Sequence, residues 1–185
     1  ALHTRANKRL RGQRMAKILG IDPGTEKSGY VIWDGEKIYE KDWVSNLRLV
    51  SMIHNGIDVD RIVIEMVEAR GMPIGKETLD TVVWIGRYYE AALGQYFAVA
   101  LVYRRDIKIH LCGSARAKPA NISRVLKDRF GEPYTLAEVP QTGKRGQPIK
   151  SKLVRVPGVL AGLTDHTWAA LAAAVYFHDT QGPVT

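Results

Sequence analysis

Apolar residues form short blocks near the start of the chain. Residues 16–22 and 28–34 are two such blocks, separated by the turn pair Pro23-Gly24. Pro-Gly is a strong turn signal, and Ile and Val favour strands, so this pattern predicts a two-stranded hairpin. Asp34-Gly35 is a second turn signal, and residues 37–40 are therefore expected to form a third antiparallel strand.

Helical and strand-like patterns alternate along the middle of the chain. Residues 46–55 carry a helical apolar pattern that ends at Gly56, and residues 61–66 form an apolar block. Residues 75–97 keep helical spacing long enough for a helix of several turns, and the apolar residues 98–103 predict a further strand.

The last third of the chain contains two more helical patterns around a polar segment. One helix is expected to end at Phe130-Gly131, and another runs from residue 162 through an alanine-rich stretch to Phe177. The alanine side chains give this last helix a face that can lie flat on a sheet, and Asp165 can cap its start. Residues 131–158 are rich in Gly, Pro and charge, and we expect a flexible basic loop there that either lies over nucleic acid or is merely solvated.

Two acidic residues terminate apolar strands. Asp22 follows the first strand and Glu65 lies near the end of the strand at 61–66. A carboxylate on a central strand is costly to bury unless it is paired or binds a metal ion. Gly29, where the chain turns back, is expected to supply a backbone angle that other residues avoid. Asp22 is therefore the first candidate for chemistry.

The chain length of 185 residues favours a single domain, which we place at 16–180. The lone cysteine, Cys112, excludes an internal disulfide and favours a reducing, cytoplasmic setting. No apolar run reaches the roughly 20 residues that a membrane span needs, so no membrane partner is expected.

The net charge of +8 favours a polyanionic partner. Much of this charge lies in residues 1–15, which hold five basic residues and no acid. We expect a basic N-terminal arm that either contacts phosphate or lies upstream of a natural start at Met15.

The hairpin resembles that of the RuvC-type Holliday junction resolvases, which belong to the RNase H-like superfamily of nucleases. In that family an Ile-Asp-Pro-Gly turn and a Gly-Tyr or Gly-Phe strand carry the first metal-binding aspartate, here Asp22. The resemblance implies an α/β fold whose five-stranded mixed sheet, three antiparallel strands and then parallel strands, is flanked by helices. It makes Glu65 the second metal-binding acid, and the small size and diverged last motif point to a phage or diverged bacterial member.

The last helix matches the family imperfectly. The family usually shows Asp or His, two residues, and then Asp, whereas this chain has Asp165 followed by Trp168, or His166 followed by Ala169. Either Asp165 is the third metal ligand, with His166 beside it as a catalytic residue, or a native Asp has been replaced by Ala169. We favour the first alternative.

Three carboxylates at one point need cations, and hard oxygen ligands favour Mg²⁺ or Mn²⁺, with two ions expected per active site. The resemblance also assigns a basic residue after the strand at 98–103 to DNA, for which we choose Lys108 and then Arg105. In the family the long helix forms a homodimer interface, although both faces of the helix could instead pack within one chain. The other candidates are Lys118, Lys144, Arg145, Lys150 and Lys152 for DNA, and Val82, Gly86 and Tyr89 for the dimer.

These observations predict a metal-dependent endonuclease that resolves four-way DNA junctions by paired phosphodiester hydrolysis. Two alternatives stay within the superfamily: a nuclease for RNA–DNA hybrids, flaps or branched DNA, and a transposase or integrase core. A third alternative is a catalytically silent junction-binding protein, which the missing acid at Ala169 would explain.

Overall fold

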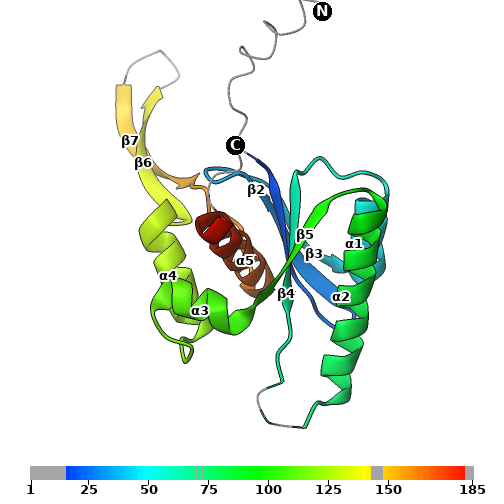
Figure 1. Ribbon diagram of the computed structural model, residues 1–185. Coiled ribbons are helices and arrows are strands. Elements are labelled where there is room, and N and C mark those ends of the chain that lie inside the picture. The colour runs from blue at the N-terminus through cyan, green and yellow to red at the C-terminus, as the bar shows by residue number, and fades with distance from the viewer. Residues whose placement is uncertain (1–15, 70, 72, 143–147, 182–185) are drawn as a thin grey trace, which may run out of the picture.

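A five-stranded mixed sheet forms the centre of the molecule (Figure 1). The computed structural model describes residues 16–69, 71, 73–142 and 148–181. The sheet has the strand order β3-β2-β1-β4-β5. Its strands are β1 (Ile18–Asp22), β2 (Lys27–Trp33), β3 (Ile38–Ser45), β4 (Arg61–Met66) and β5 (Ala98–Tyr103).

The pairing of the strands confirms the predicted sheet. β1 pairs antiparallel with β2, and β2 with β3, whereas β4 lies parallel to β1 and β5 parallel to β4. In the β1–β4 ladder Ile21 lies opposite Ile64. The next residue of each strand is an acid, so the two acids lie at the same end of neighbouring strands. β3 is longer than the predicted 37–40 because it continues along β2 as far as Ser45.

Helices cover both faces of the sheet (Figure 1). α1 and α2 lie on one face and α5 lies on the other, with α3 and α4 packed beside α5. No helix in the described part of the chain is long and apolar enough to cross a bilayer. The helices are α1 (Asn46–His54), α2 (Lys76–Gly94), α3 (Arg104–Cys112), α4 (Pro119–Phe130) and α5 (Asp165–Gln181).

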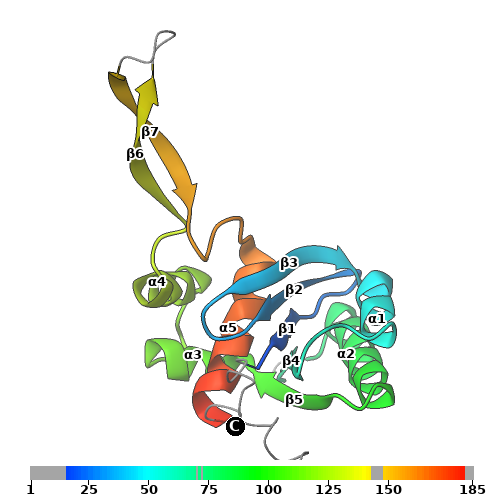
Figure 2. The same cartoon turned by 90° about the horizontal axis from the view of Figure 1, so that it is seen from above.

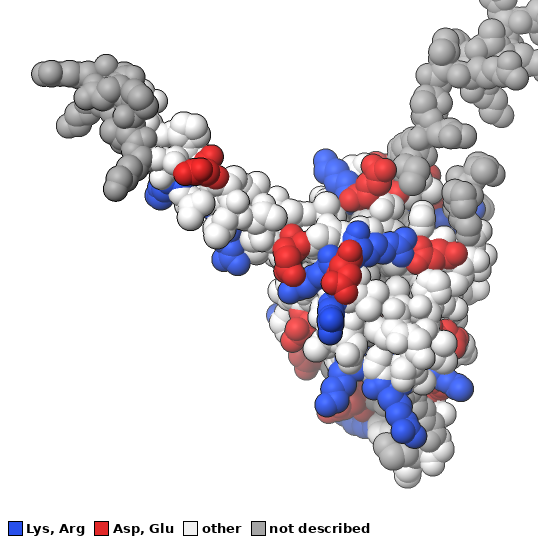
Figure 3. Space-filling model, turned by 90° about the vertical axis from the view of Figure 1, so that its left-hand side faces the viewer, with Lys and Arg blue, Asp and Glu red and all other residues white. Residues whose placement is uncertain are grey.

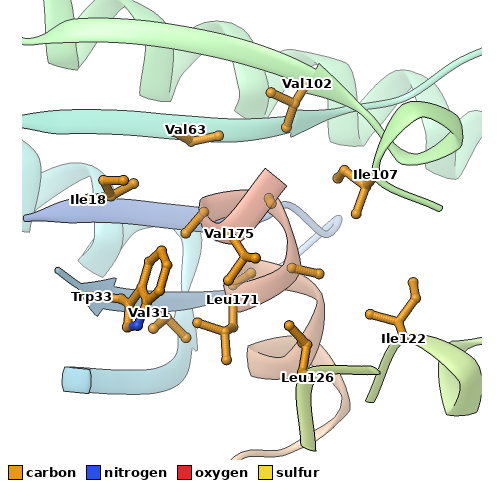
Figure 4. Packing of buried hydrophobic residues seen from close by; sticks show 14 of the residues in the cluster. Ile18, Val31, Trp33, Val63, Val102, Ile107, Ile122, Leu126, Leu171 and Val175 are labelled. Atoms are coloured by element: carbon orange, nitrogen blue, oxygen red, sulfur yellow. The ribbon is translucent and has the colours of Figure 1, made fainter. Parts of the chain in front are cut away.

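Each face of the sheet has its own apolar core. Between the sheet and α5, side chains such as Val31, Val63 and Leu171 meet residues from α3 and α4, including Ile107 and Leu126 (Figure 4). On the other face, side chains of β1, β2 and β4 pack against α1 and α2. The sheet is therefore covered on both sides, as its continuous apolar strands predict.

Glycines let α5 approach the sheet very closely. A Cβ added at Gly20 would lie 2.2 Å from the backbone oxygen of Ala170, and one at Gly29 would lie 2.6 Å from that of His166. Ala170, Leu171 and the alanines after them are buried, which confirms the flat small-residue face. The expectation of an unusual angle at Gly29 is wrong, because its φ is not positive and the close helix is what requires glycine.

The segment 131–158 is not the loop that its composition predicts. It contains two paired strands, β6 (Tyr134–Thr142) and β7 (Pro148–Pro157), which form a hairpin that extends away from the body (Figure 2). Most side chains on β6 are exposed, so burial leaves no alternating pattern in this sequence, and cross-strand pairing holds the ribbon together. Residues 1–15, with the predicted basic arm, lie outside the described residues, as do Lys144 and Arg145.

Candidate active site

Asp22 and Glu65 meet at one edge of the sheet. Asp22 is the last residue of β1, and Glu65 is the second-to-last residue of β4. Because the two strands are parallel neighbours, their carboxylates lie side by side. The Asp22 side chain is 14% exposed and that of Glu65 is 11% exposed. Two carboxylates that share a largely dehydrated edge need positive charge nearby.

Arg104 supplies such a charge. It is the first residue of α3, directly after β5, and its Nε donates to Glu65 Oε1 at 2.7 Å. Its Nη2 lies 3.9 Å from Asp22 Oδ1. Lys108 and Arg105 are the basic residues predicted for this position, and Arg104 is not among the predictions. Helix α3 was not predicted, because residues 104–106 at its start are polar and show no helical apolar pattern.

His166 completes the group around Asp22. Its Nδ1 donates to Asp22 Oδ2 at 3.1 Å, and its ring stacks on Trp43 of β3, with the ring centroids 5.2 Å apart. The ammonium of Lys27 lies 4.4 Å from the centroid of the Trp43 ring on the adjoining strand. Stacking and one hydrogen bond together fix the orientation of the imidazole, although its side chain is 52% exposed. Trp43 could not be assigned to this site from the amino-acid sequence.

Burial dominates the electrostatics of the carboxylate pair. It raises the pKa of Glu65 to about 7; Arg104 opposes this shift, and the neighbouring Asp22 adds to it. Burial also raises the pKa of Asp22, against the hydrogen bond from His166 and the charge of Arg104. Both carboxyl groups therefore hold a proton more tightly than they would in water, and groups with shifted pKa values cluster at functional sites.

A pocket lies over these groups. It is lined by Asp22, Glu65, Arg104, Lys108 and His166. The pocket lining also contains Asp165, Trp168 and Ala169 at the start of α5. The fold therefore brings all the predicted catalytic residues to one concave surface.

Asp165 differs from Asp22 and Glu65 because it is exposed to solvent. In the described part of the chain, no group of three or more His, Cys, Asp or Glu side chains is arranged to hold a metal ion. Asp22 and Glu65 nevertheless fit a hard divalent cation, since both offer buried oxygen donors and already share one cationic partner. The assignment of Asp165 as a third ligand stays a prediction.

The structure is similar to solved structures of known resolvases. Thermus thermophilus RuvC matches with a TM-score of 0.59 and 14% sequence identity, over 91% of this chain and 99% of RuvC. The chain has the fold of RuvC. T. thermophilus RuvC in complex with a Holliday junction substrate matches with a TM-score of 0.56 and 18% identity over the same shares of the two chains. The yeast mitochondrial Holliday junction resolvase Ydc2 matches over 62% of both chains, with 13% identity and a TM-score of 0.47.

The sequence itself gives no such match. No protein-family model matches it, and a comparison with curated proteins finds no match. The similarity to RuvC therefore lies in the backbone fold, and the chemistry of the site must be argued from its residues.

The predicted basic residues lie in the pocket, on α3, before α4 and on the β6–β7 hairpin. Lys108 lines the pocket, Arg105 is exposed on α3, and Lys118 lies just before the first residue of α4. Lys150 and Lys152 lie on β7. Figure 3 shows Lys and Arg side chains along the hairpin and on the adjacent body, interspersed with acidic side chains. On this face the basic side chains are thus separated by acidic ones.

The outer face of α2 exposes apolar side chains. Val82 is 37% exposed and Tyr89 is 36% exposed, and Leu79, Val83 and Leu93 are at least half exposed. A Cβ at Gly86 would meet no atom within 4 Å, so no neighbour in this chain requires glycine at that position. The described structure therefore provides no packing partner for this face.

Proposed function

We propose that this protein is a metal-dependent endonuclease that resolves four-way DNA junctions by hydrolysing two phosphodiester bonds. The observation that carries this proposal is the meeting of Asp22 and Glu65 at the ends of neighbouring parallel strands. This pair lies in a fold that is shared with RuvC along 91% of the chain. Basic side chains around the same pocket support a polyanionic substrate.

Asp22 and Glu65 are the residues that would hold Mg²⁺ or Mn²⁺, with Asp165 as the third ligand. Two such ions, when bound there, would supply activation of the attacking water and stabilisation of the charge on the attacking and leaving oxygens. The protein's part is to hold these carboxylates together at the sheet edge, where Arg104 opposes the rise in pKa that burial causes.

His166 is proposed as the group that accepts or delivers a proton beside Asp22. Its Nδ1 is held by the Asp22 carboxylate, so the other ring nitrogen, Nε2, is the atom available for proton transfer. Stacking on Trp43 limits rotation of the ring and keeps this nitrogen in a constant direction. The half-exposed position of the ring suits transfer of a proton to solvent.

Substrate contacts are proposed for the basic residues on the pocket side. Lys108 lies in the pocket, near the scissile phosphate in this proposal, while Arg105 and Lys118 would contact flanking phosphates. Lys150 and Lys152 of the hairpin, together with Lys144 and Arg145, would contact a DNA arm further from the cut. Each neutralised phosphate releases counterions, so binding should weaken steeply with salt.

We further propose a homodimer formed through α2, with Val82, Gly86 and Tyr89 at its centre. Two symmetric cuts require two active sites, and a two-fold dimer supplies them at matching positions. The exposed apolar side chains of α2, and the free space around Gly86, suit close packing against a second α2.

Substitution of Asp22 by Asn tests the nuclease. Cleavage of a synthetic four-way junction should fall by about 10³-fold or more, because a ligating carboxylate becomes a weaker neutral ligand. Junction affinity, measured by electrophoretic mobility shift, should stay near that of the native protein. Asp128→Asn, a similar change at an exposed position on α4, should leave both quantities unchanged. Loss of binding together with cleavage in Asp22→Asn would show instead that Asp22 is structural.

A catalytically silent junction-binding protein is the second candidate. It is favoured by one observation: Ala169 lines the pocket at the position where the resemblance expects an acid. Ala169→Asp distinguishes the two candidates, since it should restore cleavage only to a protein that binds junctions without cutting them.

A further inference from the structure

Arg104 lies where a metal ion and a phosphate would both have to be accommodated. Its guanidinium faces Glu65 at 2.7 Å and Asp22 at 3.9 Å from the first residue of α3. The Nε–H of Arg104 uses Oε1 of Glu65, one of the oxygens that a divalent ion would need. An arginine cannot give up its charge near neutral pH, so it competes with any other cation for this oxygen.

The burial of the two partners is unequal. The Glu65 side chain is 11% exposed, whereas that of Arg104 is 45% exposed. Moving the guanidinium into water would therefore cost little, because it is already partly hydrated, while the carboxylate would stay in place. A carboxylate left without any cation at this position would carry the full cost of a buried charge. The arrangement allows exchange of one cation for another and disfavours an empty site.

We propose that Arg104 is a resident counter-cation, which holds Asp22 and Glu65 together and which a divalent metal ion must displace from Glu65. This inference rests on the proposed function, in which both acids are metal ligands. It makes Arg104 a positioning residue whose two states, on the carboxylates and away from them, depend on the presence of metal. In the second state the guanidinium lies free at the wall of the pocket, where a substrate phosphate can bind it.

Metal affinity in the absence of DNA is the direct test. Titration calorimetry with Mn²⁺ at pH 8 would compare the native protein with Arg104→Ala, Arg104→Lys and Arg124→Ala. Loss of the competing charge should make Arg104→Ala bind roughly three- to tenfold more tightly. Arg104→Lys should lie between the two, because it keeps the charge and loses the planar fork. Arg124→Ala removes the same charge from an exposed position on α4, outside the pocket lining, and should bind like the native protein.

The movement of the side chain can be followed without any substitution. In the native protein, the Arg104 Nε–H resonance should shift and exchange faster with water as Mg²⁺ is added, because its carboxylate acceptor is lost. Unchanged or weaker Mn²⁺ binding by Arg104→Ala, or an Arg104 signal that ignores Mg²⁺, would overturn the inference while leaving the metal site intact. If none of these proteins bound Mn²⁺, the metal assignment in the proposed function would fail as well.

Discussion

At the scale of single residues, the loss of water around Asp22 and Glu65 determines the properties of the site. Asp22 and Glu65 could be found from the sequence because each follows an apolar strand, and a parallel ladder must bring such residues together. Arg104 could not be found, because the turn from β5 into α3 decides which of two adjacent arginines faces the acids. His166 was predicted, but its stacking partner Trp43 lies on a strand that turned out longer than expected.

Glu65→Gln should stabilise the metal-free protein in a pH-dependent way. The pKa of Glu65 is about 7 in the folded chain, above its ordinary value of 4.5. Between these values the folded state binds more protons than the unfolded state, so the free energy of unfolding falls as pH rises. The variant escapes this loss and should be about 1–3 kcal/mol more stable than the native protein at pH 8, with little difference near pH 4.

Thermal unfolding with a chelator present, at both pH values, measures this effect. The same melts with Mg²⁺ provide a control, because the ion should stabilise the native protein more than the variant, which lacks a charged ligand. A difference between the two proteins that is the same at pH 4 and pH 8 would show that Glu65 titrates normally.

At the scale of elements, the close contact between α5 and the sheet positions the site. The alanine run in the sequence predicted this contact, because small side chains on one face allow a helix to lie flat on a sheet. The need for glycine at Gly20 and Gly29 was not predictable, because it depends on which backbone atoms of α5 lie opposite them. The same contact places His166 next to Asp22.

Gly20→Ala should be strongly destabilising. Its Cβ would lie 2.2 Å from the Ala170 oxygen, so either β1 or α5 must shift, at a cost of about 3 kcal/mol. Gly94→Ala is the matched control, since a Cβ there meets nothing and Ala favours helix by about 0.5 kcal/mol or more. Urea unfolding of both variants would measure the two free energies. Equal stabilities for the two variants would contradict the close packing of α5.

The β6–β7 hairpin, in contrast, could not be predicted from the sequence. Its strands have Gly-, Pro- and charge-rich surroundings and exposed side chains on both faces, so the usual alternation of apolar and polar positions is absent. Local pairs such as Arg155 over the ring of Tyr134, 4.0 Å from its centroid, support the ribbon. Such pairs depend on a register that the sequence does not reveal.

At the scale of the whole molecule, the two proposed interaction surfaces lie on opposite sides of the body. The hairpin extends from the side of α4 and α5, while α2 covers the other face of the sheet (Figures 1 and 2). A dimer formed through α2 therefore leaves the pocket and the hairpin of each protomer free for DNA.

Gly86→Leu should weaken this dimer. The native protein is expected to sediment with twice the 20.6 kDa mass of one chain, because its exposed apolar α2 face is buried against a second copy. A leucine at Gly86 would keep the two helices apart and shift the equilibrium toward the monomer by at least tenfold in Kd, about 1.4 kcal/mol. Ala120→Leu, at an exposed position on α4, is the control. Unchanged sedimentation of Gly86→Leu would remove this helix from the interface.

The most direct test of the account is the cleavage of a synthetic four-way junction by the native protein. The reactions would contain Mg²⁺, Mn²⁺ or a chelator, with a matched duplex and an RNA–DNA hybrid as control substrates. We expect paired, symmetric nicks in the junction that require a divalent ion, with no comparable cutting of either control substrate. Tight junction binding without nicks under every metal condition, followed by cleavage in Ala169→Asp, would contradict the claim that Asp22, Glu65 and Asp165 suffice for catalysis.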